Sequence, residues 1–92
     1  MKIIEMNKLI LKRLKGRKFF VDNVIESLDR KHSIMFYRYI CYDLRTGKEF
    51  EFILMHDTLD ANKIYKIDKK GNNLISVKRG LTELEKEMLY IS

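Results

Sequence analysis

The 92-residue sequence has one cysteine, no proline, no tryptophan and no long hydrophobic run. Because Cys41 has no partner in the chain, an intramolecular disulfide is excluded. A lone cysteine among apolar residues is typical of a buried thiol in a reducing compartment. Charged residues interrupt the apolar stretches near the N-terminus, so we expect neither a signal peptide nor a membrane-spanning helix. These absences predict a cytoplasmic protein.

Motifs for catalysis, metals and cofactors are also missing. His56 and Asp57 lie together at the end of a predicted strand, but a metal site needs more ligands, and His32 is the only other histidine. Acids such as Glu49 and Glu51 fall on the solvent side of their strand, where they are expected to face Lys and Arg. No glycine cluster has the frame of a phosphate loop. The sequence therefore predicts no enzyme, no metal site and no cofactor.

The overall composition is that of a folded, soluble protein. Apolar residues make up 46% of the chain and charged residues 35%, which separates it from disordered sequences. A chain of this length forms one domain, spanning residues 1–92. The sequence is poor in Ala and rich in Lys, Ile and Asn, a usage typical of AT-rich coding sequences such as those of low-GC bacteria, their phages or their plasmids.

Two helices are predicted, one near each end. Apolar residues at steps of three and four, ending in Ile10 and Leu14, predict a helix over residues 3–15 that closes at Gly16. Thr82 and Glu85 form a capping box, in which each side chain bonds the backbone N–H of the other residue. A second helix is therefore expected over residues 83–90.

Between the helices the pattern changes to a period of two. Five strands are predicted, over residues 18–27, 35–43, 49–55, 63–68 and 74–78. Residues 57–62 are a short connector with room for about one helical turn. The apolar phase of the strands places a common set of side chains in the core: Val21, Ile25, Ile40, Phe50, Phe52, Leu54 and Val77.

These elements predict an α+β, mainly β fold. Five short antiparallel strands over residues 18–78 cannot bury both faces as a flat sheet, so we expect a curled sheet or small barrel, SH3-like or OB-like, flanked by the two helices. The connector at 57–62 is shorter than the helix that OB-folds often carry between their third and fourth strands. That difference favours the SH3-like alternative slightly.

The charge distribution is the most informative feature of the chain. The net charge of +6 lies entirely in residues 1–18, and the remaining residues balance to zero. A segment without any acid carries six cations: Lys8, Lys12, Arg13, Lys15, Arg17 and Lys18. Such uncompensated charge favours a phosphate-rich partner. Alternatively, Glu83, Glu85 and Glu87 of the C-terminal helix neutralise it within the fold.

The aromatic strand over residues 35–43 offers a second candidate surface. Tyr37 and Tyr39 share one face with Cys41, and Arg38 lies on the other face beside Phe36. If one face is open, rings and guanidinium groups there resemble the stacking platforms that bind single-stranded nucleic acid. If a terminal helix covers it, the tyrosines are core residues that only extend their hydroxyls to the surface.

The first functional hypothesis is a non-enzymatic nucleic-acid-binding domain, for DNA or RNA without sequence preference. The six cations of residues 8–18 would hold phosphates, with Arg38, Tyr37 and Tyr39 adding stacking. The alternative is a small protein-binding module or inhibitor encoded by a phage or other mobile element, which occludes a partner's surface or adds a strand to its sheet. Membrane-surface association through the N-terminal helix is a third possibility, weakened by the lack of interfacial aromatic residues in that helix.

Overall fold

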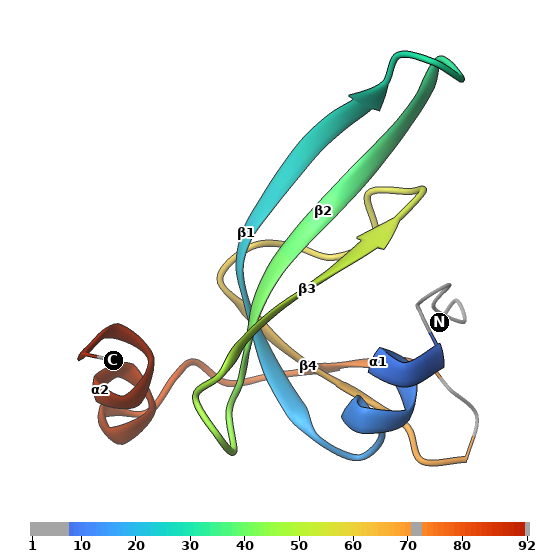
Figure 1. Ribbon diagram of the computed structural model, residues 1–92. Helices are drawn as coiled ribbons and strands as arrows, with labels where there is room; N and C mark the ends of the chain where they lie inside the picture. Colours follow the sequence, from blue (N-terminus) through green and yellow to red (C-terminus); the bar gives the residue numbers. More distant parts are fainter. Residues whose placement is uncertain (1–7, 71–72, 92) are drawn as a thin grey trace.

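The computed structural model describes residues 8–70 and 73–91 (Figure 1). In chain order the elements are α1 (Lys8–Leu14), β1 (Lys18–Asp29), β2 (Ile34–Asp43), β3 (Glu49–Leu54), β4 (Lys63–Ile67), β5 (Leu74–Val77) and α2 (Glu83–Ile91). The five predicted strands and both helices are thus confirmed. Residues 3–7 of the predicted first helix, and residues 71–72 between the predicted strands 63–68 and 74–78, lie outside the described residues. The connector at 57–62 contains no helical turn.

The strands form one antiparallel sheet in the order β3-β2-β1-β4-β5. In the described part of the chain β3 and β5 are edge strands that do not pair with each other, so the sheet is not closed into a barrel. The lengths of the strands give the reason. β1 and β2 extend as a long hairpin beyond the rest of the sheet (Figure 1), whereas β5 has only four residues with which to meet another edge.

A β-bulge in β1 decides which side chains reach the core. Val21 pairs with Cys41, but the next pairing joins Asn23 to Ile40, so Asp22 is an extra residue in the ladder. An extra residue reverses the alternation of the strand beyond it. Ile25, which the unbroken alternation placed in the core, consequently lies on the opposite face, and its burial is only intermediate.

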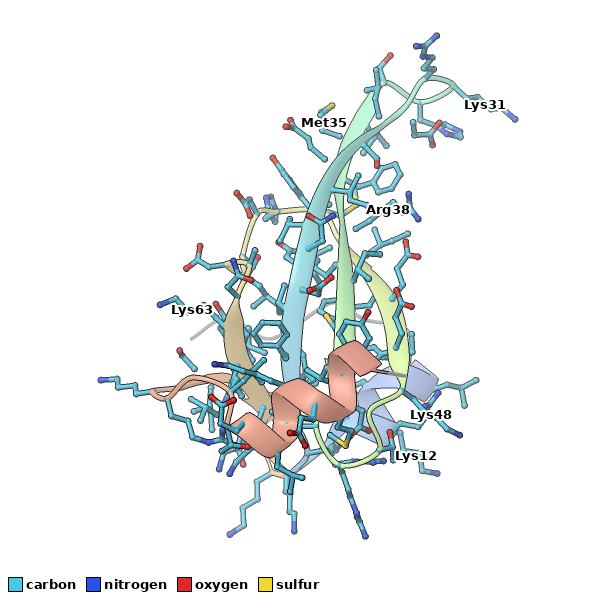
Figure 2. All side chains as sticks on the ribbon, turned by 90° about the vertical axis from the view of Figure 1, so that its left-hand side faces the viewer. Lys12, Lys31, Met35, Arg38, Lys48 and Lys63 are labelled. Carbon is cyan, nitrogen blue, oxygen red and sulfur yellow. The ribbon has the colours of Figure 1, made fainter. Side chains whose placement is uncertain are left out.

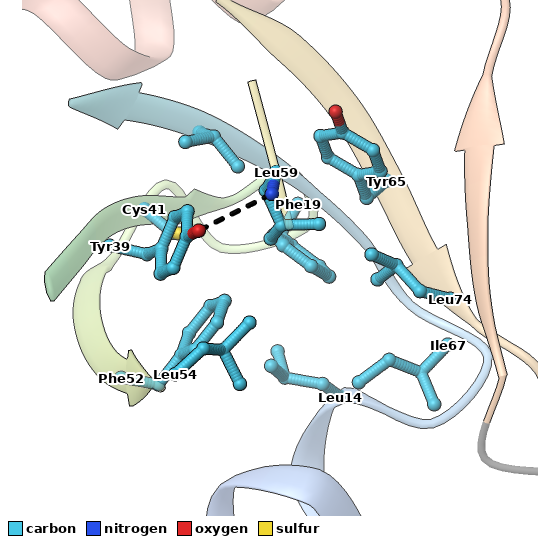
Figure 3. Close-up of a cluster of buried hydrophobic side chains, with 11 residues drawn as sticks. Leu14, Phe19, Tyr39, Cys41, Phe52, Leu54, Leu59, Tyr65, Ile67 and Leu74 are labelled. Carbon is cyan, nitrogen blue, oxygen red and sulfur yellow. Dashed lines mark hydrogen bonds between the residues drawn. The ribbon is translucent and has the colours of Figure 1, made fainter. Parts of the chain in front are cut away.

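Two groups of buried side chains lie on the two faces of the sheet. The larger one, the main core, holds Leu14, Phe19, Val21, Tyr39, Cys41, Phe52, Leu54, Leu59, Tyr65, Ile67 and Leu74 (Figure 3). The smaller one joins Leu89 of α2 to Phe20 and Ile64. Leu14 of α1 contributes to the main core, and Leu89 of α2 contributes to the smaller group.

The core residues predicted from sequence are recovered in part. Phe52, Leu54 and Val21 are buried as expected, whereas Phe50, Ile40 and Val77 are only partly buried. The thiol of Cys41 is fully buried, and this burial raises its pKa. The prediction of a buried, reduced cysteine is therefore confirmed as far as burial is concerned.

Two neighbouring residues of β3 provide a test of which face of that strand is buried. Phe52 is 3% exposed and stacks on Tyr39, whereas Ile53 is 49% exposed on the other face. Replacing Phe52 with Ala should lower the free energy of unfolding by about 3–5 kcal/mol, because it leaves a cavity in the main core. The matched change Ile53→Ala should cost less than about 1 kcal/mol. Urea denaturation of both variants measures the difference, and equal losses would contradict the assigned phase.

Candidate nucleic-acid interface

Lys12 and Arg13 of α1 lie on the side of that helix away from the core. Leu14 is buried in the main core, and Ile10 and Leu11 pack against it, so Lys12 and Arg13 are left exposed to solvent. This is the amphipathic arrangement that the spacing of the apolar residues predicts. The helix therefore presents basic side chains outward at the lower end of the molecule in Figure 2, where Lys12 is labelled.

The turn after α1 brings these cations beside the end of β4. Gly16 adopts a φ of 73°, and its backbone N–H donates a hydrogen bond of 2.7 Å to the carbonyl oxygen of Ile67. The side chain of Lys69 passes so close to Gly16 that a Cβ atom there would collide with it. The left-handed backbone is the stronger reason for glycine here, since the flexible side chain of Lys69 can move away from a Cβ atom.

This contact adds lysines that sequence reasoning did not include. Lys66, Lys69 and Lys70 come from β4 and the turn after it, about fifty residues beyond α1, and no local pattern links them to it. We call the combined surface the basic end. It comprises Lys12, Arg13, Lys15, Lys18, Lys66, Lys69 and Lys70.

Within the basic end, Lys18 of β1 pairs directly with Lys66 of β4 in the sheet register. Directly opposed residues have Cβ atoms about 4.5–5.5 Å apart, and like charges at this separation destabilise a sheet. No residue of the basic end forms an ion pair with an acid in the described part of the chain. A bound anion would therefore reduce the repulsion between Lys18 and Lys66.

Among the described residues, the acids of α2 form no ion pair with Lys18 or Lys66. Glu85 is bonded to Arg79 at 2.7 Å and Glu83 to Lys86 at 3.5 Å, both close to α2 itself. Neutralisation of α1 by these acids is therefore not among the described contacts.

Arg17 differs from the other cations of the segment because it has a structural partner. Its Nη2 atom lies 2.7 Å from Oδ2 of Asp43, a buried carboxylate whose Oδ1 accepts a 2.8 Å hydrogen bond from the backbone N–H of Arg45. Removing this guanidinium would leave a buried carboxylate without its charge partner, which is strongly destabilising. Arg17 is therefore a poor choice for a variant meant only to reduce surface charge.

The predicted stacking residues are not gathered at the basic end. Arg38 is ion-paired with Glu51 and lies up the sheet from Lys12 (Figure 2). This pairing raises the pKa of Arg38 and lowers that of Glu51. Tyr37 is partly buried beside a shallow pocket that also includes three acids: Glu26, Asp57 and Asp60. Acids beside a ring disfavour the approach of a phosphate backbone.

Tyr39 is fully buried and is a core residue. Its hydroxyl accepts hydrogen bonds from the backbone N–H groups of Thr58, at 2.9 Å, and Leu59, at 3.3 Å. Figure 3 shows the bond from Leu59. Burial raises the pKa of this hydroxyl. The ring is enclosed by the main core and is not exposed for base stacking. Its hydroxyl instead organises the connector at 57–62.

Comparisons with known proteins give no relative from which a function would follow. No protein-family model matches the sequence, no curated protein matches it, and no solved structure matches the fold significantly. In the described residues, neither a helix capable of spanning a membrane nor a group of three or more potential metal ligands is found.

The hydroxyl of Tyr39 gives a direct stability test. Tyr39→Phe should lower the free energy of unfolding by about 1–3 kcal/mol, because two backbone N–H groups lose their acceptor at a buried site. Tyr37→Phe is the matched control, since the Tyr37 hydroxyl makes no hydrogen bond to a described residue. Urea unfolding curves of both variants provide the comparison. A loss as large for the control as for Tyr39→Phe would refute the assigned role.

Glu85 predicts a pH dependence of stability. Its hydrogen bonds to Arg79 lower the pKa of its carboxyl from 4.5 to about 2. Below pH 4.5 the unfolded chain takes up a proton here while the folded chain does not, so this contribution to stability falls as the pH drops toward 2. The stability difference between wild type and Glu85→Gln should be largest above pH 5 and should shrink between pH 4.5 and 2. A difference that is constant over this range, measured by urea unfolding, would contradict the ion pair.

Proposed function

We propose that this protein is a non-enzymatic nucleic-acid-binding domain that holds phosphates with its basic end. The observation that carries the proposal is the meeting of cations from α1, β1, β4 and the β4–β5 turn, without an ion pair to any described acid. The opposed pair Lys18 and Lys66 adds to it, because bound phosphate would relieve the repulsion between them.

Binding of this kind acts on the nucleic-acid backbone. Phosphate contacts position a strand but carry little sequence information, so we propose binding to DNA or RNA without sequence preference. Stacking by Tyr39 is omitted from the proposal because its ring lies in the core, and Arg38 is omitted because it is paired with Glu51 and lies away from the basic end. A cytoplasmic location accords with this function and is part of the proposal.

For the fold we propose a small open barrel of the OB-like or SH3-like kind. The OB-fold is described as a partly open five-stranded barrel, and an open five-stranded sheet accords with that description better than with a closed barrel. This reverses the slight preference for the SH3-like alternative that the short connector suggested.

The alternative function is a small protein-binding module or inhibitor, of the kind that phages and other mobile elements encode. One specific observation favours it: the long β1–β2 hairpin and the neighbouring end of β3 expose large apolar side chains, namely Leu28, Ile34, Met35, Ile53 and Met55. In addition, the described strands leave the outer edge of β1 unpaired beyond Val21. Exposed apolar surface and a free strand edge are features used in strand-addition complexes.

A salt titration tests the first proposal. Binding to an unstructured, unphosphorylated single-stranded oligonucleotide is measured by fluorescence anisotropy for wild type and for a triple variant, Lys12→Gln, Arg13→Gln and Lys15→Gln. Each lost phosphate contact should reduce the log–log salt slope by about 0.7, so the triple variant should be flatter by about 2 and weaker on all sequences alike. Arg17 is left intact because it holds Asp43.

The control variant removes the same charge elsewhere. Lys31, Lys63 and Lys78 are exposed and lie outside the basic end, and changing all three to Gln should leave the salt slope near the wild-type value. Failure of the wild-type protein to bind at about 50 mM salt would refute the nucleic-acid proposal and favour the protein partner. Equal slopes for the two triple variants would show that binding is not localised at the basic end.

A further inference from the structure

A concave surface adjoins the basic end on the face of the sheet where Leu89 of α2 packs with Phe20 and Ile64. It lies between the α1–β1 turn, the beginning of β1, the β2–β3 turn and the segment between β5 and α2. We call it the basic cleft. Its walls include the side chains of Arg17, Lys18, Leu44, Arg45, Arg79 and Glu85.

The two acids near the basic cleft, Asp43 and Glu85, both form ion pairs with arginines. Asp43 is bonded to Arg17 at 2.7 Å, and Glu85 receives two hydrogen bonds from Arg79, at 2.7 and 3.1 Å. Such charge-assisted bonds fix the planes of both guanidinium groups. The cleft therefore has two arginines that are held in place by the fold before any ligand arrives.

Once Arg17 and Arg79 are paired with acids, the remaining positive charge of the cleft comes from Lys18 and Arg45. Neither forms an ion pair with a described acid, and Lys18 also faces Lys66 across the β1–β4 ladder. Arg79 has five N–H groups and uses three in the described hydrogen bonds, which leaves two for a ligand. The cleft thus offers an excess of two positive charges together with unused N–H donors.

We propose that the basic cleft binds a phosphomonoester, the terminal phosphate of a nucleic-acid strand whose following phosphates lie on the basic end. A terminal phosphate carries nearly two negative charges at pH 7 and has three free acceptor oxygens, whereas a phosphate inside a strand carries one charge. Gly16 and Arg17 line the cleft and directly follow the cations of α1, so a strand that ends in the cleft continues along that helix. The inference rests on the proposed function and specifies which part of the ligand this site recognises.

The test compares one oligonucleotide in three forms: 5′-phosphorylated, 3′-phosphorylated and without a terminal phosphate. We expect one of the phosphorylated forms to bind about tenfold more tightly than the unphosphorylated form at the same salt concentration, as one added charge-assisted interaction provides. Lys18→Gln combined with Arg45→Gln should abolish this preference. Because Lys18 also belongs to the basic end, the double variant should bind the unphosphorylated oligonucleotide more weakly than wild type, whereas Arg45→Gln alone should leave that binding near the wild-type level.

Two controls sharpen the result. Lys63→Gln combined with Lys78→Gln removes equal charge away from the cleft and should keep the tenfold preference, and Arg45→Gln alone covers the case in which the double variant does not fold. Equal binding of all three oligonucleotides by wild type would overturn the inference while leaving the proposed function standing. Absence of binding to any of them would overturn both. Inorganic phosphate that competes as strongly as the phosphorylated oligonucleotide would also overturn it, since the ligand would then be a free phosphate.

Discussion

The position of strand β1 and the bulge within it control the rest of the molecule. Phe19, Phe20 and Val21 of β1 pair with both β2 and β4, whereas the second half of β1 pairs with β2 alone and forms the projecting hairpin. The extra residue Asp22 lets Val24 continue the face that Val21 begins, so that apolar residues from both halves reach the main core. Without the bulge, Val24 would lie on the opposite face and Ile25 would take its place.

This arrangement also explains why the charge of the chain stays uncompensated. The beginning of β1 is where α1, the end of β4 and the β4–β5 turn meet, joined by the hydrogen bond from Gly16 to Ile67. α2, which carries Glu83, Glu85 and Glu87, contributes Leu89 to the smaller buried group on the other face. The topology therefore concentrates cations at one end and keeps the acids of α2 away from α1. The basic cleft lies where these two regions adjoin, and the acids there are bonded to arginines.

Local patterns in the sequence were sufficient to predict the elements but not their assembly. The capping box at Thr82 forms as its spacing predicts, and the buried phase of β3 agrees with its alternation. The bulge at Asp22 left no signal, since an extra residue in a ladder depends on the partner strand. The roles of Tyr39 and Lys66 depend on pairings between distant segments. From residue types alone, Tyr39 was predicted to stack on bases, whereas the fold places it in the core. Residue types also gave no reason to include Lys66, Lys69 and Lys70, which β4 and the turn after it bring to the basic end.

The most direct test of the account is a map of the ligand-binding surface by heteronuclear NMR. Amide chemical shifts are followed while an unstructured single-stranded oligonucleotide is added to the full chain. We predict that the perturbed amides lie in Lys12–Lys18, Lys66–Lys70 and the β2–β3 turn, and that the hairpin residues Leu28–Phe36 do not shift. Perturbation confined to the hairpin, or no perturbation at about 50 mM salt, would contradict the claim that the basic end binds nucleic acid.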